Sequence, residues 1–306
     1  MLSIRYMEFG KTEPEQLKSI DLSLPPEPVV NKSVLAKSKK TEPKIYVGCP
    51  EWGKKEWVGR FYPPGTQERD FLYSYARLFN CIELNTTYYQ VPAVAQVQKW
   101  RTIAGPGFRF CPKFPQFITH VQRLTNCMAE THAFINAISA FEDSLGPVFL
   151  MPHPQMGPGS LGIIEKFIAK LPAEIDLFLE LRHPAWFANG LNKRLYDMAK
   201  HYDIGLIITD AAGRRDCVHM HLSKPEAFIR FVGNELHPTD YTRIDEWVNR
   251  IKLWLDEGLT AMYFFMHLHN RVDAPVLSKY LVEKLNQICH LHLTVPQMHD
   301  NQGVLF

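Results

Sequence analysis

The amino-acid sequence predicts a (β/α)8 barrel, the TIM-barrel fold, formed by a single domain with an irregular N-terminal extension. The main observation is that, from residue 44 onward, short apolar runs alternate with amphipathic stretches of helical period. The chain also has 306 residues, of which 46% are hydrophobic. This is enough to bury the core of one such barrel.

Eight of the apolar runs have the composition of parallel strands that are covered by helices. They are rich in β-branched or aromatic residues and are bounded by Gly, Pro, Asn or Asp. These runs are 45–48, 81–84, 108–111, 147–151, 175–181, 205–209, 217–222 and 261–266. Helical patterns lie between most of them, at 67–79, 93–103, 127–142, 160–171, 190–202, 241–257 and 275–289. In the pattern at 241–257, Ile244, Val248 and Ile251 recur at helical spacing, and Gly258 is a typical helix end.

One link departs from the barrel pattern. Only about seven residues separate the sixth and seventh predicted strands, whereas a parallel crossover needs about a dozen or more. The alternative fold is an open, doubly wound sheet. No Gly-x-Gly-x-x-Gly motif follows the first strand to support that alternative, so the sequence favours the barrel.

The two ends of the chain differ from its centre. Residues 1–43 lack periodicity and contain Pro25-Pro26 and a basic run at 37–40, which predicts a tail or an N-terminal cap. We therefore expect the barrel to span residues 44–290, with a C-terminal tail at 291–306.

Charge and composition narrow the class of protein. The net charge of +2 gives no overall field that would attract nucleic acid, and no run of 18 apolar residues predicts a membrane span. The N-terminus lacks the apolar core of a signal peptide. The six cysteines show no Cys-x-x-Cys spacing, so we expect reduced thiols and a cytoplasmic protein.

Ionisable side chains gather at the predicted C-terminal ends of the strands, where barrel enzymes carry their chemistry. Five of them are candidate catalytic residues: Glu83, Lys113, Glu180, His183 and Asp210. Seven others are candidates for substrate binding: Trp52, Asn85, Tyr88, His120, Arg182, Trp186 and His221. In this hypothesis Glu83 and Glu180 act as base and acid, while Lys113 and Arg182 hold an anionic group. His183 or Asp210 orients or shuttles the proton.

Each of these residues also has a structural interpretation. Glu83 and Lys113 would form an ion pair between neighbouring strands, and Arg182 would pair with Asp210 or Glu180. His183, which precedes a proline, would cap a loop. The aromatic residues Trp52, Tyr88 and Trp186 would belong to the core.

Two pairs of histidines suggest a divalent metal site. His219 and His221 share one face of a predicted strand, as do His267 and His269, and the two strands are expected to be neighbours. With Glu180 or Asp210 they would provide ligands for zinc, manganese or iron. No motif requires a cofactor. The absence of Gly-x-Ser-x-Gly, P-loop and His-Glu-x-x-His motifs argues against serine hydrolases, P-loop nucleotidases and zincins.

The same stretches resemble the YecE-like proteins, or domain of unknown function 72, over about residues 44–290. The matching stretches are VGCPEW at 47–52, FYPPG at 61–65, IELNTTY at 82–88 with Pro92, FRFCPK at 108–113, ITH at 118–120, LELRHPAWF at 179–187 and TD at 209–210. The resemblance implies a barrel whose site lies at the C-terminal mouth. The motif positions it brings to this chain are Glu83, Asn85, Tyr88, Lys113, His120, Glu180, Arg182, His183 and Asp210. The family has no established reaction and is grouped with sugar isomerases by fold.

The chain also departs from the family pattern. Cys49-Pro50-Glu51 replaces the usual Thr-Ser-Gly before Trp52. The Arg-Leu-His-Gly expected on strand seven is matched to 219–222, which reads His-Met-His-Leu. The Asn-Asn at the end of strand eight is replaced around 267–269.

Three functions follow from these patterns. The first is an enzyme that uses acid/base chemistry on a small polar substrate, sugar-like or phosphorylated. The second is a nucleic-acid-linked protein. Its tail at 302–306 resembles the Gln-x-x-Leu-Phe peptide that docks on the bacterial sliding clamp through Gln302, Leu305 and Phe306, unless these residues pack on the protein itself. The third is a non-catalytic binding module.

Overall fold

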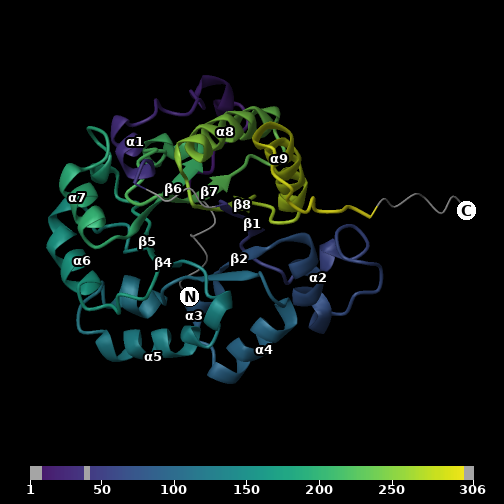
Figure 1. The fold of residues 1–306 in the computed structure, drawn as a ribbon, viewed down its shortest axis with the longest axis horizontal. Coiled ribbons are helices and arrows are strands. Elements are labelled where there is room, and N and C mark those ends of the chain that lie inside the picture. Colours follow the sequence, from purple (N-terminus) through teal and green to yellow (C-terminus); the bar gives the residue numbers. More distant parts are fainter. Residues whose placement is uncertain (1–8, 38–41, 300–306) are drawn as a thin grey trace, which may run out of the picture.

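The computed structural model of the chain describes residues 9–37 and 42–299. Eight parallel strands form one sheet that curls into a nearly closed barrel with helices around it, which confirms the (β/α)8 prediction (Figure 1). The strands are β1 Lys44–Cys49, β2 Cys81–Leu84, β3 Arg109–Pro112, β4 Val148–Leu150, β5 Leu177–Leu179, β6 Gly205–Ala211, β7 Glu226–Val232 and β8 Ala261–His267.

The α-helices of the described residues are α1 Val29–Leu35, α2 Phe71–Leu78, α3 Thr86–Tyr89, α4 Val94–Ala104, α5 Met128–Ser139, α6 Leu161–Ile168, α7 Lys193–His201, α8 Pro238–Glu257 and α9 Ala274–Cys289. Shorter helical turns are η2 Gln16–Ser19, η3 Lys55–Trp57, η4 Glu68–Asp70, η5 Phe117–Val121, η6 Glu142–Ser144, η7 Pro158–Ser160, η8 Pro184–Trp186 and η9 Ala212–Cys217. Seven of the α-helices fall on the seven predicted helical patterns, whereas α1 and α3 were not predicted.

The barrel closes between β1 and β8 and is least regular between β3 and β4. The strand order is β3-β2-β1-β8-β7-β6-β5-β4, and β1 pairs with β8 over five residues. Between β3 and β4 there are isolated bridges, one of which joins Lys113 to Phe149. The Phe114 N–H also donates to the Phe149 carbonyl at 3.0 Å. These contacts draw β3 and β4 together at the end of the barrel that carries Lys113.

The prediction of the seventh strand at 217–222 is wrong. Those residues follow η9 as irregular chain, and Met220 has a positive φ of 57°. The strand is Glu226–Val232, which pairs with both β6 and β8. Glu226 and Arg230 interrupt its apolar pattern because they occupy inward-facing positions at the two ends of the barrel, where polar groups are accommodated.

Helix α1 takes the position of the crossover helix that the short link between β6 and β7 lacks. Figure 1 shows α1 between α7 and α8 in the outer ring. The buried Asn31 amide donates to the Met220 carbonyl at 2.8 Å and accepts from the Leu222 N–H at 2.8 Å. Upstream of α1, Glu27 accepts from the Trp254 indole of α8 at 2.9 Å. The segment before the barrel thus covers the part of the wall between β6 and β7, where the connecting chain forms no α-helix.

Strand pairing places alternate residues inside the barrel, where they form two layers of different chemistry. The deeper layer is largely aromatic and contains Tyr46, Cys81, Cys111, Phe149, Phe178, Ile207, Phe228, Tyr263 and Phe265. Gly205 makes room for it, because a Cβ there would lie 2.1 Å from the Phe178 ring. The layer above it is polar and faces the C-terminal mouth.

Three further features concern the chain as a whole. All six cysteines are free thiols. No helix within the described ranges is long and apolar enough to cross a membrane. After α9 the chain runs on to His299, whose N–H donates to the Arg60 carbonyl at 2.8 Å. The predicted clamp-binding residues Gln302, Leu305 and Phe306 lie outside the described residues, so that docking stays a prediction.

The N-terminal extension is expected to contribute to folding stability through Asn31. We expect Asn31→Ala to lower the free energy of unfolding by about 2–4 kcal/mol, because it leaves a buried N–H and a buried carbonyl without partners. Urea denaturation at pH 7 measures the change. Ser33→Ala, on the exposed side of the same helix, is the matched control and should shift stability by less than about 0.5 kcal/mol. Equal effects of the two substitutions would contradict this role of α1.

Candidate active site

Six polar side chains point inward at the C-terminal mouth, above the aromatic layer. Four lie on strands β2, β6, β7 and β8, and two directly follow β3 and β5: Glu83, Thr209, Arg230 and His267, with Lys113 and Glu180. Five of the six are less than a tenth exposed, and His267 is the exception. Side chains this polar and this buried are costly unless each finds a partner or a ligand.

Arg230, from β7, connects the carboxylates of two other strands. Its Nε and Nη2 donate to the two oxygens of Glu83 at 2.8 and 2.9 Å, and its Nη1 donates to Glu180 Oε1 at 2.7 Å. The planar guanidinium suits this geometry because its donors lie in one plane and remain charged. Arg230 was not among the residues predicted for the site, because the seventh strand was misplaced.

Glu83 is saturated with hydrogen bonds. Besides Arg230, it accepts from Asn85 Nδ2 at 2.9 Å and lies 3.0 Å from His267 Nε2. Burial by itself would raise the pKa of Glu83, but Arg230 and His267 together lower that pKa well below its ordinary value. Glu83 is therefore an anion with no free acceptor position, which does not suit the role of catalytic base expected for it.

Glu180 differs from Glu83 in one respect. Its Oε1 accepts from Arg230, from Arg182 Nη2 at 3.2 Å and from Thr209 Oγ1 at 2.9 Å. Its Oε2 is buried and has no hydrogen-bond partner among the described residues. Burial opposes ionisation, but Arg182, Arg230 and Lys113 lower the pKa of Glu180 to about 2. Glu180 is thus a permanent anion at neutral pH with one oxygen left unpaired.

Lys113 is the basic residue of this layer that has no carboxylate partner among the described residues. Within the described ranges, its Nζ forms no ion pair or hydrogen bond; it lies over the Tyr88 ring, 4.6 Å from the centroid. Burial, followed by the positive charges of Arg230 and Arg182, lowers the pKa of Lys113 to about 7. The expected ion pair between Glu83 and Lys113 is absent because Arg230 occupies Glu83. Lys113 is therefore only partly protonated at neutral pH.

A cavity of about 870 Å³ opens above this layer. Residues from several strand ends line it: Phe9, Trp52, Asn85, Tyr88, Trp100, Lys113, Arg182, Arg230, His267, His269 and Arg271, among others. Glu51 is the one carboxylate among its described lining residues, and it lies near Lys54 and Arg271. The cavity is therefore cationic on its floor and aromatic on its walls. Its volume falls in the range of small-molecule sites.

His267 lines the cavity and also contacts the ionised carboxylate of Glu83. Because Glu83 is ionised, it accepts a hydrogen bond from Nε2–H of His267, which leaves Nδ1 as the acceptor nitrogen of this imidazole. Burial lowers the pKa of His267, although Glu83 opposes this effect. His267 is therefore a neutral imidazole at physiological pH.

Asp210 lies outside this site. It faces away from the barrel interior, between β6 and α8, where it accepts from Arg243 Nη2 at 2.7 Å and from Trp247 Nε1 at 2.7 Å, and it pairs with Arg215. Burial opposes its ionisation, but Arg243 and Arg215 lower the pKa of Asp210. The alternation of the strand puts Thr209, and not Asp210, toward the mouth, so the geometry gives Asp210 a structural role.

His183 and Trp186 also lie away from the cavity. His183 Nδ1 accepts from the Ala185 N–H at 3.2 Å and caps the short helix η8, as the structural interpretation proposed. Trp186 is fully buried, and its indole donates to the Met156 carbonyl at 2.8 Å. Arg182 pairs with Glu180, and Phe9 of the N-terminal segment lies over its guanidinium at 4.1 Å.

Of the other predicted binding residues, Trp52, Asn85 and Tyr88 line the cavity. His120 packs against the Tyr88 ring, with the ring centroids 5.4 Å apart, behind the cavity wall. Burial, followed by the charge of Lys113, lowers the pKa of His120 to about 3. His120 is therefore a neutral support for Tyr88.

The four histidines considered as metal ligands are not brought together. His219 and His221 lie on the link between β6 and β7, where His219 stacks on Phe187 and contacts the Ile207 carbonyl, while His267 and His269 lie at the mouth. The hypothesis depended on a strand at 217–222 that does not exist. Across residues 9–37 and 42–299, no group of three or more His, Cys, Asp and Glu side chains is arranged to hold a metal ion.

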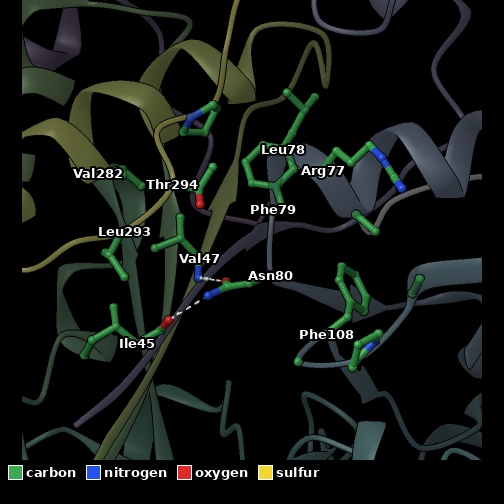
Figure 2. A pocket seen from close by; sticks show the side chains of 15 residues that line it. Ile45, Val47, Arg77, Leu78, Phe79, Asn80, Phe108, Val282, Leu293 and Thr294 are labelled. Atoms are coloured by element: carbon green, nitrogen blue, oxygen red, sulfur yellow. Dashed lines mark hydrogen bonds between the residues drawn. The ribbon is translucent and has the colours of Figure 1, made fainter. Parts of the chain in front are cut away.

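A second cavity, of about 250 Å³, lies outside the barrel wall near the N-terminal ends of the strands (Figure 2). It is bordered by β1, the end of α2 and the chain after α9. The amide of Asn80 is already bonded to the Ile45 carbonyl and the Val47 N–H. The remaining walls are mostly apolar, so this cavity offers little chemistry compared with the mouth.

The family of the chain follows from comparison with known proteins. The model of the family described as "Protein of unknown function DUF72" matches residues 46–300. The chain belongs to the DUF72 family. The UPF0759 protein YecE of Escherichia coli (strain K12) is 30% identical over 262 residues, which covers 79% of this chain and 93% of YecE.

Two solved DUF72 structures have a similar fold. The protein EF0366 from Enterococcus faecalis V583 superposes with a TM-score of 0.65 at 17% identity, covering 83% of this chain and 98% of its own. The protein TM1631 from Thermotoga maritima MSB8 gives a TM-score of 0.61 at 19% identity, covering 81% and 100%. The Arg-Leu-His-Gly expected on strand seven was matched to 219–222 because that strand was misplaced. At the end of the observed β7 the chain reads Arg230-Phe-Val-Gly233, which has the arginine and the glycine of that motif.

Removal of Arg230 is expected to destabilise the fold strongly. We expect Arg230→Met to lower the free energy of unfolding at pH 7 by about 3–5 kcal/mol, because two buried carboxylates lose their shared cation. Glu83 and Glu180 have lowered pKa values in the native protein, so the stability that Arg230 provides is present above the ordinary glutamate pKa of 4.5. It is lost as the pH falls from there toward about 2.

The measurement is denaturant unfolding of both proteins at pH 7 and at pH 4. The loss should be larger at pH 7, and Arg271→Met, at the exposed rim, serves as the control with little change at either pH. A loss for Arg230→Met that does not depend on pH would argue against its electrostatic role.

Proposed function

We propose that the cavity at the barrel mouth is the active site of an enzyme that transfers protons on a small anionic carbonyl compound, such as a sugar phosphate. The observation that carries the proposal is Lys113, a buried amine on the cavity floor that has no carboxylate partner among the residues that the structure describes. A structural lysine would be expected to have one. A functional lysine needs its amine unpaired and partly neutral.

The charge balance of the floor supports an anionic substrate. The carboxylates of Glu83 and Glu180 offset the guanidinium groups of Arg182 and Arg230. Among the described residues Lys113, when protonated, is then the uncompensated charge of the floor, and at the rim Lys54 and Arg271 share the single carboxylate of Glu51. A phosphate or carboxylate group bound above Arg182 would restore neutrality.

The walls support a substrate with a polar ring or chain. Trp52, Tyr88 and Trp100 present aromatic surfaces to the cavity, and such surfaces stack on the apolar faces of sugars. Asn85 offers an amide to hydroxyl groups. The two histidines at the end of β8, His267 and His269, add further hydrogen-bonding groups.

Proton transfer is assigned to Lys113 and His267 instead of the two carboxylates. Lys113 has a pKa of about 7, which suits a general base or acid near neutral pH. The neutral imidazole of His267, held by Glu83, presents a second acceptor. Glycoside cleavage by a carboxylate pair is disfavoured, because both Glu83 and Glu180 are ionised and held by arginine.

Deuterium exchange tests this function without knowledge of the product. The protein is incubated in D2O with ribose 5-phosphate and related hydroxycarbonyl phosphates, and exchange of the hydrogen next to the carbonyl is followed by NMR. We expect exchange with at least one such phosphate, with a rate that rises with pH through about 7 as Lys113 loses its proton. Lys113→Met should lower that rate by about 100-fold or more.

Two control variants separate the site from the surrounding surface. His267→Asn keeps a donor toward Glu83 but loses the imidazole and should also slow exchange, whereas His183→Asn, outside the cavity, should leave the rate unchanged. The absence of exchange with every phosphate, or an unchanged rate in Lys113→Met, would reject the proposal.

A further inference from the structure

We propose that Lys113 forms a covalent imine with the aldehyde or ketone group of a bound substrate. This inference deepens the proposed function and rests on it for the place where the substrate binds. It goes further in one respect, because it makes the lysine a nucleophile that bonds to carbon and not only a group that moves a proton.

The geometry around Nζ is the first support. The amine lies over the Tyr88 ring at 4.6 Å from the centroid and 5.5 Å from that of Phe149, and it lines the main cavity. In the part of the chain that the structure describes, nothing hydrogen-bonds to it. The lone pair of the neutral amine is therefore not occupied by a protein donor, and the cavity provides the approach for a carbonyl carbon.

The bridge between β3 and β4 fixes where the amine can reach. Lys113 is joined to Phe149 by a parallel bridge, and its carbonyl accepts from Thr87 Oγ1 at 2.7 Å. A backbone held on both sides restricts the side chain to the interior of the barrel. Such pre-organisation is what a nucleophile requires.

Glu180 is the second, independent support. Its buried Oε2 has no hydrogen-bond partner within residues 9–37 and 42–299, and its negative charge acts on Lys113. The protonated imine formed on Lys113 is positively charged, and it is a stronger acid than the ammonium form of the parent amine, so a nearby anion is needed to keep it protonated. Glu180, which lies in the same polar layer and whose charge acts on Lys113, supplies such an anion and has an oxygen that no protein donor occupies among the described residues.

The step balances without any further reactant. The lone pair of the neutral Lys113 amine forms a bond to the carbonyl carbon as the carbonyl π bond breaks, and a proton passes from the nitrogen to the oxygen to give a carbinolamine. The hydroxyl group then takes up one proton from the solvent and leaves as water, while the nitrogen lone pair forms the C=N bond of the protonated imine. One amine, one carbonyl and one proton therefore give one iminium ion and one water.

The amine is suited to this step at neutral pH. With a pKa of about 7, about half of Lys113 is neutral at pH 7, whereas an exposed lysine with an ordinary pKa of about 10.4 is neutral in fewer than about one molecule in 1,000. Lys113 should therefore react with aldehydes much faster than exposed lysines do.

Reductive trapping tests the inference on the full-length protein. Glycolaldehyde phosphate is added with cyanoborohydride, which donates a hydride to the imine and converts it to a stable secondary amine. Peptide mass mapping then locates the adduct. At pH 7 we expect Lys113 to be labelled at least 10-fold faster than the exposed Lys99, with a half-maximal rate near pH 7.

Three controls make the result specific. Glycolaldehyde without phosphate should label Lys113 more slowly, because it lacks the anion that the arginines bind. Lys113→Arg keeps a cation and should lose the adduct at this position while the labelling of Lys99 stays unchanged. Its thermal unfolding should confirm that the variant is folded.

The outcome separates the imine from the proposed function. Labelling of Lys113 no faster than that of Lys99 overturns the imine, and it leaves the proton-transfer proposal in place if deuterium exchange still depends on Lys113. Rapid and selective labelling supports the imine even if no exchange is observed, in which case it is the proton-transfer proposal that fails.

Discussion

The bidentate contact of Arg230 with Glu83, extended by its third donor to Glu180, is the interaction on which the mouth of the barrel depends. It connects β7 to β2 and to the end of β5. Because one cation serves two buried anions, both glutamates stay ionised and neither is free to act as an acid. The same cation also faces Lys113 and lowers the pKa of that lysine. The ion pairs that hold three strands together therefore also set the protonation state of the amine beside them.

In the outer wall, too, one part of the chain serves two purposes, namely the N-terminal segment before β1. The link between β6 and β7 contains no α-helix, and η9 with the following chain occupies that length. Helix α1 closes the resulting gap and is fixed by Asn31, whose amide satisfies a carbonyl and an N–H of the link. The same N-terminal segment reaches the mouth, where Phe9 covers Arg182. One segment outside the eightfold repeat thus supports both the wall and the site.

The fold could be predicted from the sequence to a large extent, because apolar runs that alternate with amphipathic helical stretches are typical of strands covered by helices. The prediction failed at β7, where the run Glu226–Val232 carries charges at inward positions. A pattern of apolar residues cannot distinguish a charge that faces solvent from one that faces a polar barrel mouth. For the same reason Asp210 was assigned to the mouth. It follows an apolar run, but the strand continues through it and directs it outward to Arg243.

From residue type alone, the sequence could predict which side chains lie together at the site, but not what each of them does there. Glu83, Lys113, Glu180 and Arg182 do lie together, but which acid pairs with which base depends on Arg230, a residue distant in sequence. An expected pair between Glu83 and Lys113 would have raised the pKa of the lysine and made it a structural cation. Since Arg230 takes both oxygens of Glu83, the lysine has no counter-ion within residues 9–37 and 42–299 and lies in a buried, cationic setting. The reactivity inferred for Lys113 is therefore a property of the pairing between strands, which appears only when the barrel is closed.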